Sequence, residues 1–243
     1  MTRAFYMLLA TIIYFGFLAT FLYLIGFVAR LPQLPTNVDK GLAGPAAYAL
    51  AIDVGLIAIF GLQHSVMARP GFKAMWTRIV PKPIERAIYV LFASLALILL
   101  FALWHPIAGN VWHVDSPIGR VVLWGVFGAG WVIVLLSTFM ISHFELFGLT
   151  QAFLHWRQRL APPAAFRVPF FYKFVRHPLY AGFFLAFWAA PTMSYSHLLL
   201  AIGMSTYMLI AIPYEERDLI DVFGDEYRNY RAKVGGLVPK VRR

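Results

Sequence analysis

The sequence predicts an all-α integral membrane protein with five to six transmembrane helices and a cytoplasmic C-terminal helical cap. Of its 243 residues, 60% are hydrophobic and only 13% are charged, with a mean hydropathy of +0.70. Soluble domains carry about 25% charged residues, so this chain is too apolar for that class. Apolar stretches also follow one another at near-spanning length, and a membrane span needs about 20 residues.

Six apolar stretches are expected to form the helices, at residues 4–29, 44–67, 86–104, 119–147, 178–191 and 196–213. The first four are long enough to span, and the first is expected to be retained because it lacks a small-residue cleavage pattern. The last two are shorter and are separated by the segment PTMSYS. We therefore expect a tight hairpin there that crosses fully or partly, which leaves five or six spans.

The positive charge is distributed unevenly along the chain. With the amino terminus in the cytoplasm, all but three of the 21 Lys and Arg residues face the cytoplasm, the exceptions being Arg30, Lys40 and Arg120. Cytoplasmic loops of membrane proteins collect Lys and Arg, so this orientation is predicted. Topology also accounts for the net charge of +10. No nucleic-acid motif accompanies the charge, so the lipid bilayer is the expected partner; the oligomeric state stays open.

Several classes of site are excluded by what the sequence lacks. There is no cysteine, which rules out disulfides, thiolate-bound zinc, iron–sulfur clusters and a cysteine nucleophile. The chain has no Gly-rich phosphate loop, G-x-S-x-G elbow or dinucleotide-binding fingerprint.

Two polar clusters near the C-terminus carry the strongest functional signal. The first, which we call the RHP stretch, is RHPLYAG at residues 176–182; the second, the acidic cluster, is YEERD at residues 214–218. Pro178 suits the first turn of a helix. Arg176 and His177 would then stand at a helix N-terminus, where free N–H groups attract a carboxylate.

The two clusters complement each other in charge. The Arg176 guanidinium is a planar fork for a carboxylate, and Glu215 and Glu216 can accept hydrogen bonds from an ammonium group or ribose hydroxyls. Gly182 permits the close approach of a ligand or of another helix. A site that takes both a carboxylate and an ammonium suits an amino-acid moiety.

Polar residues in the second expected span are further candidates, because charges inside spans are costly. Asp53 lies near its middle and could orient substrate or carry protons; an interhelical hydrogen bond is the structural alternative. Gln63 and His64 lie just inside its apolar zone and are candidates for the substrate side. Arg69 before Pro70 is explained equally well as a helix stop and snorkelling anchor.

The end of the fourth expected span carries His143 and Glu145. Thr138, Ser142 and Glu145 would share one helix face there. Glu145 is either functional or paired with the basic loops. A metal site built from His64, His143 and a carboxylate has no local ligand spacing in its favour, so no metal is predicted.

The C-terminal clusters resemble a known family. The order RHPLYAG, EERDL at 215–219 and FGDEYRNY at 223–230 is similar to the carboxy-terminal half of the membrane methyltransferases typified by isoprenylcysteine carboxyl methyltransferase. The resemblance implies S-adenosyl-L-methionine as cofactor, in a pocket open to the cytoplasm. The residues that it assigns to the cofactor are Arg176, His177, Pro178, Tyr180, Gly182, Tyr214, Glu215 and Glu216.

Segments nearer the amino terminus narrow the resemblance. FGLQHSVMARP at 60–70, IER at 84–86 and HFELFGL at 143–149 resemble the bacterial branch that contains methanethiol S-methyltransferase and the NnrU-like proteins. This implies one methyltransferase domain over 1–243, with a four-helix substrate-side half at 1–149 and a cofactor-binding half at 150–243. The implied reaction converts methanethiol to dimethyl sulfide, with hydrogen sulfide as a related acceptor, in a bacterial inner membrane.

The corresponding mechanistic hypothesis is in-line attack of a thiol sulfur on the sulfonium methyl group in a dry pocket. His64, His143 and Glu145 are the candidates for the base that deprotonates the thiol. Gln63, Arg69 and Asp53 are the candidates for the substrate side. Three alternatives stay open: an isoprenylated or lipid acceptor, a non-catalytic NnrU-like accessory protein of nitrogen-oxide metabolism, and a small transporter.

Overall fold

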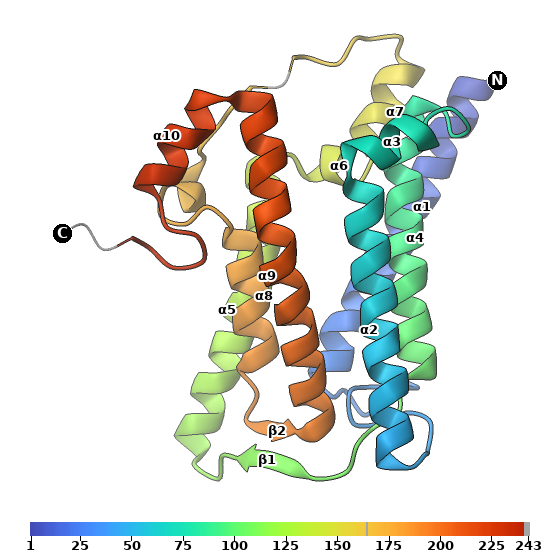
Figure 1. Ribbon diagram of the computed structural model, residues 1–243. Coiled ribbons are helices and arrows are strands. Elements are labelled where there is room, and N and C mark those ends of the chain that lie inside the picture. The colour runs from blue at the N-terminus through green and yellow to red at the C-terminus, as the bar shows by residue number, and fades with distance from the viewer. Residues whose placement is uncertain (164, 241–243) are drawn as a thin grey trace. The chain divides into compact units, whose positions relative to one another are not determined.

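The computed structural model describes residues 1–163 and 165–240. Arg242 and Arg243, which are counted among the predicted cytoplasmic charges, lie outside the described residues. The predicted all-α membrane class is confirmed: within the described ranges, five helices are long and apolar enough to cross a membrane. The chain divides into two compact units (Figure 1).

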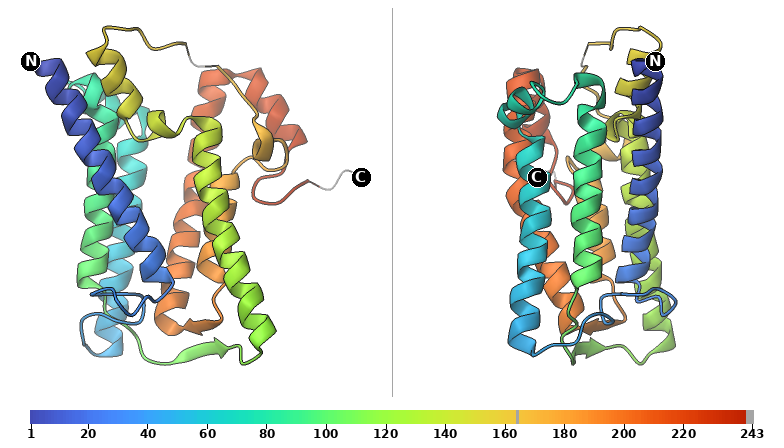
Figure 2. Two further views of the ribbon diagram at one scale, coloured as in Figure 1. Left: turned by 180° about the vertical axis from the view of Figure 1, so that it is seen from behind. Right: turned by 90° about the vertical axis from the view of Figure 1, so that its right-hand side faces the viewer.

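Unit 1 comprises Met1–Gly109, His143–Pro162 and Ser194–Leu199. Its helices are α1 (Thr2–Val28), α2 (Ala46–Ala68), α3 (Pro70–Trp76), α4 (Lys82–Leu103), α6 (His143–Leu146) and α7 (Leu149–Trp156). Helix α4 packs against both α1 and α2, and α7 packs against α1 and α4 (Figure 2). Their buried side chains form one cluster, made of Ala10, Ile13, Met67, Ala87, Tyr89, Val90 and Ala152. Small residues in that cluster let the helices approach closely.

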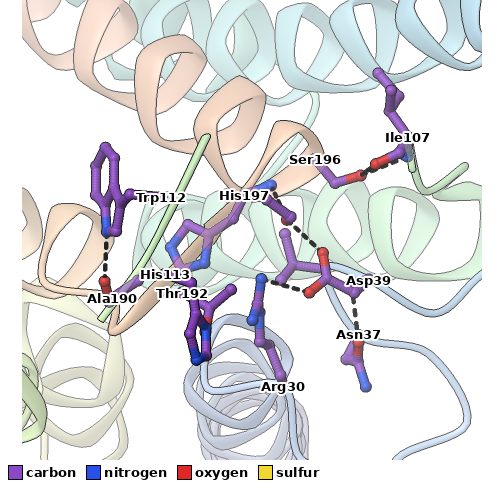
Figure 3. A network of polar contacts seen from close by, with 12 residues as sticks. Arg30, Asn37, Asp39, Ile107, Trp112, His113, Ala190, Thr192, Ser196 and His197 are labelled. Carbon is purple, nitrogen blue, oxygen red and sulfur yellow. Dashed lines mark hydrogen bonds and ion pairs between the residues drawn. The ribbon is translucent and has the colours of Figure 1, made fainter. Parts of the chain in front are cut away.

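The loop after α1 takes part in a network of polar contacts (Figure 3). The carboxylate of Asp39 pairs with Arg30 Nη2 at 2.6 Å and accepts a hydrogen bond from the Ser194 hydroxyl. The indole of Trp104, fully buried, donates to the carbonyl of Val38 at 2.9 Å. The loop is therefore fastened by one buried hydrogen bond, from Trp104, and by the partly exposed contacts of Asp39.

Unit 2 comprises Asn110–Ser142, Pro163–Met193 and the chain from Leu200 onward. Its elements are β1 (Asn110–His113), α5 (Pro117–Ile141), η1 (Phe170–Lys173), α8 (Pro178–Trp188), β2 (Thr192–Ser194), α9 (Tyr195–Phe223) and α10 (Asp225–Lys233). The last residue of β2 and the first turn of α9 belong to unit 1. The main contact within unit 2 is between α5 and α8, which run side by side in Figure 2.

Two glycines face each other where α5 meets α8. A Cβ added at Gly130 would lie 2.7 Å from the backbone of Gly182, and one added at Gly182 would lie 2.7 Å from the Gly130 carbonyl. Trp131 packs beside this contact on the rings of Phe183 and Phe187, at centroid distances of 5.7 and 6.0 Å. The close approach that Gly182 permits is thus made to another helix.

Five helices of the described ranges have the length and composition of membrane spans, and α8, which forms in the predicted stretch 178–191, does not. Helix α8 has 11 residues, a length of about 16 Å, which is too short to cross a bilayer core of about 30 Å. The chain continues beyond α8 as a largely buried extended segment whose β2 pairs with β1. Trp112 Nε1 donates to the Ala190 carbonyl at 3.0 Å, and Val114 N donates to that of Pro191 at 2.9 Å. Irregular backbone of this kind is tolerated at membrane depth where protein satisfies it.

Two predicted helix boundaries are wrong. The stretch 119–147 is not one helix: Ser142 is extended (φ −179°, ψ 84°), α5 ends before it and α6 starts after it. Thr138, Ser142 and Glu145 therefore do not share a face. The last span does not end at residue 213 either, because α9 runs through Pro213 to Phe223. Pro213 is exposed, whereas Met204, Met208 and Ala211 bury one face of α9 and sustain the helix.

The glycine contact gives a first prediction. Gly130→Ala puts a methyl group against helix backbone and should destabilise the protein by about 1–3 kcal/mol, as overpacking does. Thermal unfolding in detergent is the measurement. Gly128→Ala, on the same helix with open space around it, should be neutral or stabilising, since Ala favours helix. Equal unfolding temperatures for the two variants would contradict the close contact.

Candidate active site

The RHP stretch connects η1 to α8. His177 precedes the helix and Pro178 occupies its first turn, as predicted from the sequence. The backbone N–H groups of Arg176 and His177 donate to the carbonyls of Gly235 and Gly236, at 2.8 and 3.2 Å. The segment after α10 therefore lies along the RHP stretch as a short parallel bridge.

The carboxylate of Glu216 lies at the centre of a charged cluster. Its Oε1 accepts from Arg176 Nε at 2.7 Å and from His177 Nε2 at 3.0 Å, and its Oε2 lies 3.0 Å from Arg231 Nε. Only 5% of the Glu216 side chain is exposed. Three cationic or hydrogen-donating groups thus satisfy one buried carboxylate, as burial of a charge requires.

Arg176 is engaged on two sides of its guanidinium. While Nε donates to Glu216, Nη1 donates to the carbonyl of Arg231 at 3.2 Å and to that of Val234. The predicted carboxylate fork is therefore bound largely by oxygens of the chain itself.

Glu215, next in the sequence, has a different environment. Its side chain is 44% exposed, and its Oε2 lies 3.8 Å from His177 Nδ1. Oε2 is buried and accepts no hydrogen bond within the described part of the chain. A buried carboxylate oxygen without a donor is costly, so this atom indicates a place for a ligand donor group.

Three tyrosines surround the acidic cluster. The Tyr230 hydroxyl donates to the Tyr172 carbonyl at 2.6 Å, and Tyr227 is 2% exposed beneath Phe166. Burial raises the pKa of Tyr230 to about 12 and raises the pKa values of Tyr172 and Tyr227 further above their ordinary 10.0. The negative charge of Glu215 also raises the pKa of Tyr172, and that of Glu216 raises the pKa of Tyr227. These phenols therefore remain neutral at neutral pH.

The other C-terminal candidates are placed differently. Tyr180 stacks on the His177 ring at 5.7 Å. Tyr214 is exposed, with the Arg217 guanidinium 5.9 Å from its ring centre. Gly182 is buried against α5. Unit 2 thus brings together Arg176, His177, Glu215 and Glu216.

Unit 1 holds the residues predicted for catalysis and substrate. The His64 ring stacks on Phe60 at 5.3 Å and packs on Tyr89 at 5.0 Å. The Arg86 guanidinium covers the same Tyr89 ring at 4.7 Å, and its Nε donates to the Leu146 carbonyl at 2.7 Å. Arg86, which lies in α4, thereby connects α4 to α6.

His143 is buried in an aromatic setting on α6. Its Nε2 is 2.9 Å from the Tyr14 hydroxyl, and its ring packs on Phe147 at 4.9 Å. Burial lowers the pKa of His143 from its ordinary value of 6.5, so the ring is neutral at neutral pH. Glu145, in the same short helix, is exposed.

The three substrate-side candidates do not form one group. Gln63 Nε2 donates to Met67 Sδ at 3.2 Å, while its buried Oε1 has no donor among the residues described. Arg69 Nε donates to the Ser65 carbonyl at 3.2 Å. Asp53, fully buried about 16 Å back along α2 from His64, accepts from the His105 N–H at 3.0 Å. This contact joins α2 to the loop after α4.

Four contacting residues were missed from the sequence: Tyr14, Tyr89, Tyr172 and Arg231. Each meets its partner across many residues of chain, such as Tyr14 with His143, so no local spacing could have found them. No group of three or more His, Asp or Glu side chains in the described chain is arranged to hold a metal ion.

Comparison with known proteins supplies the family. No protein-family model and no solved structure matches the chain. A methanethiol S-methyltransferase of Crocosphaera subtropica is 48% identical over 241 residues, covering 99% of this chain and 94% of that protein. One of Mycobacterium tuberculosis is 49% identical over 226 residues, covering 93% and 92%. Human Nurim is 29% identical over 203 residues, covering 79% and 74%. The chain belongs to the methanethiol S-methyltransferase family.

Proposed function

We propose that the protein is an S-adenosyl-L-methionine-dependent methyltransferase that converts methanethiol to dimethyl sulfide, with hydrogen sulfide as a second acceptor. The acceptor is proposed from the names of relatives that align over nearly the whole chain. The donor is supported by the charged cluster of unit 2, and above all by the unsatisfied buried oxygen of Glu215. When bound, the cofactor supplies a methyl group activated by the sulfonium charge.

The residues of unit 2 fit the polar end of such a cofactor. Glu215 offers an acceptor for an ammonium group. The first turn of α8, after Pro178, presents backbone N–H groups and the positive end of a helix dipole to a carboxylate. Tyr180 and the neutral tyrosines beside the acidic cluster provide apolar surface without adding charge.

The substrate side is assigned to unit 1. His143 is the favoured base, because its buried ring is neutral at neutral pH and a neutral imidazole can take up a proton. His64 and Glu145 are the other two candidates, and Gln63 Oε1 is a buried acceptor for a thiol S–H. We propose one domain with a substrate-side half at 1–149 and a cofactor-binding half at 150–243. The charge bias supports a bacterial inner membrane, with the amino terminus and the cofactor cluster in the cytoplasm.

Gas analysis tests the reaction. Cells expressing the chain and fed methanethiol should release dimethyl sulfide, measured in the headspace, and the double variant His177→Ala, Glu215→Ala should release none. Glu226→Gln, an exposed glutamate of α10, is the control and should match the wild type. Binding of the cofactor without any dimethyl sulfide would favour an isoprenylated or lipid acceptor. No binding in detergent would contradict every methyltransferase assignment.

His143 gives a separate prediction. His143→Ala should lower kcat by about a hundredfold or more, the usual contribution of a general base. Tyr14→Phe should lower it less, because only the hydrogen bond to Nε2 is lost. In the wild type, activity should fall as the pH drops through the His143 pKa, which lies below 6.5 because the ring is buried. His155→Ala, in α7 of the same unit, is the matched control; an equal loss there would argue against a specific role for His143.

A further inference from the structure

Two adjacent glutamates of α9 have opposite surroundings. Glu216 is 5% exposed, and both of its oxygens are occupied by Arg176, His177 and Arg231. Glu215 is 44% exposed, and its buried Oε2 accepts no hydrogen bond from the described residues. The pair therefore has one carboxylate with partners on both oxygens and one with an open acceptor.

The partners of Glu216 all fasten the C-terminal segment. Arg231 belongs to α10. Arg176 reaches past Glu216 to the carbonyls of Arg231 and Val234, and its own N–H donates to the Gly235 carbonyl. Glu216 thus lies where the RHP stretch, α9 and the segment after α10 meet, and each of its oxygens already contacts a group of the chain.

His177 connects the two carboxylates. A carboxylate oxygen only accepts hydrogen bonds, so the 3.0 Å contact with Glu216 Oε1 places a proton on His177 Nε2. The other ring nitrogen, Nδ1, faces Glu215 Oε2 at 3.8 Å, which is beyond hydrogen-bond distance. A group with several N–H donors can bridge a carboxylate oxygen and an imidazole nitrogen placed this far apart.

We propose that Glu215 Oε2 and His177 Nδ1 together bind the ammonium group of the methyl donor. Glu216 does not touch the donor; it is a positioning residue that holds His177 in the required tautomer and fastens residues 225–240 to the RHP stretch. This division of roles rests on the proposed function, because it takes S-adenosyl-L-methionine as the donor.

Calorimetry with two ligands tests the ammonium site. S-adenosylhomocysteine carries the amino-acid moiety, whereas 5′-methylthioadenosine has the same nucleoside without it. Glu215→Gln should weaken S-adenosylhomocysteine about tenfold to a hundredfold, as expected for a lost charged hydrogen bond, and leave methylthioadenosine within about twofold. Glu226→Gln should change neither. Equal weakening of both ligands would move Glu215 to the ribose and overturn the ammonium assignment.

Hydrogen exchange of the ligand-free protein tests the role of Glu216. Glu216→Gln should speed amide exchange in residues 225–240, while Glu215→Gln should not. In turnover, Glu216→Gln should raise KM for the donor and leave kcat within about threefold, since bound donor restores the fastened arrangement. Should Glu216→Gln not fold, Arg231→Gln removes one of the same contacts from a half-exposed side chain and should speed exchange in part.

The outcomes separate the two proposals. Weaker S-adenosylhomocysteine binding in Glu216→Gln with unchanged exchange would overturn the positioning role and make Glu216 a ligand. Failure of the wild type to bind either nucleoside would overturn the proposed function and with it the ammonium site. The exchange experiment needs no ligand, so it would still decide whether Glu216 fastens the C-terminal segment.

Discussion

The buried carboxylate of Glu216 is the constraint on which the rest of unit 2 depends. An ionised group with 5% exposure is stable only if it is paired, and removing one partner of a buried pair costs about 3–5 kcal/mol. Glu216 belongs to α9, and its partners come from two other pieces of chain, the RHP stretch and α10. One carboxylate therefore determines where each piece ends up, including the histidine that faces Glu215.

Packing between α5 and α8 serves the same cluster from the apolar side. Gly130 and Gly182 let the two backbones touch, and Trp131 is packed between the rings of α8. Because α8 starts directly after His177, the position of this glycine contact also determines where the N-terminus of α8 lies. Gly182 stands in the polar motif by sequence, yet its contact is with a helix. Small residues in a ligand motif can thus act by helix packing.

The sequence predicted the features that depend on local chemistry. Spanning helices were found because length and hydropathy decide them, and Pro178 marked the start of α8 because its ring suits only a first turn. The missed features depend on contacts across the chain. Ser142 breaks a continuous apolar run with no local breaker, and Pro213 fails to end α9 because buried neighbours sustain the helix. Likewise, no sequence motif near Arg231 indicates that it pairs with Glu216. The different surroundings of Glu215 and Glu216 also cannot be read from the sequence, because they depend on partners elsewhere in the chain.

The extended segment after α8 bears on how the chain is made. Its carbonyls at Ala190 and Pro191 would be unsatisfied in lipid, and the groups that satisfy them belong to Trp112 and Val114. Those donors are about eighty residues earlier, and the ribosome therefore delivers them first. Since backbone groups cannot stay unpaired in lipid, this piece needs β1 and Val114 in place when it folds. The order of translation thus supplies a template before the segment that requires it emerges.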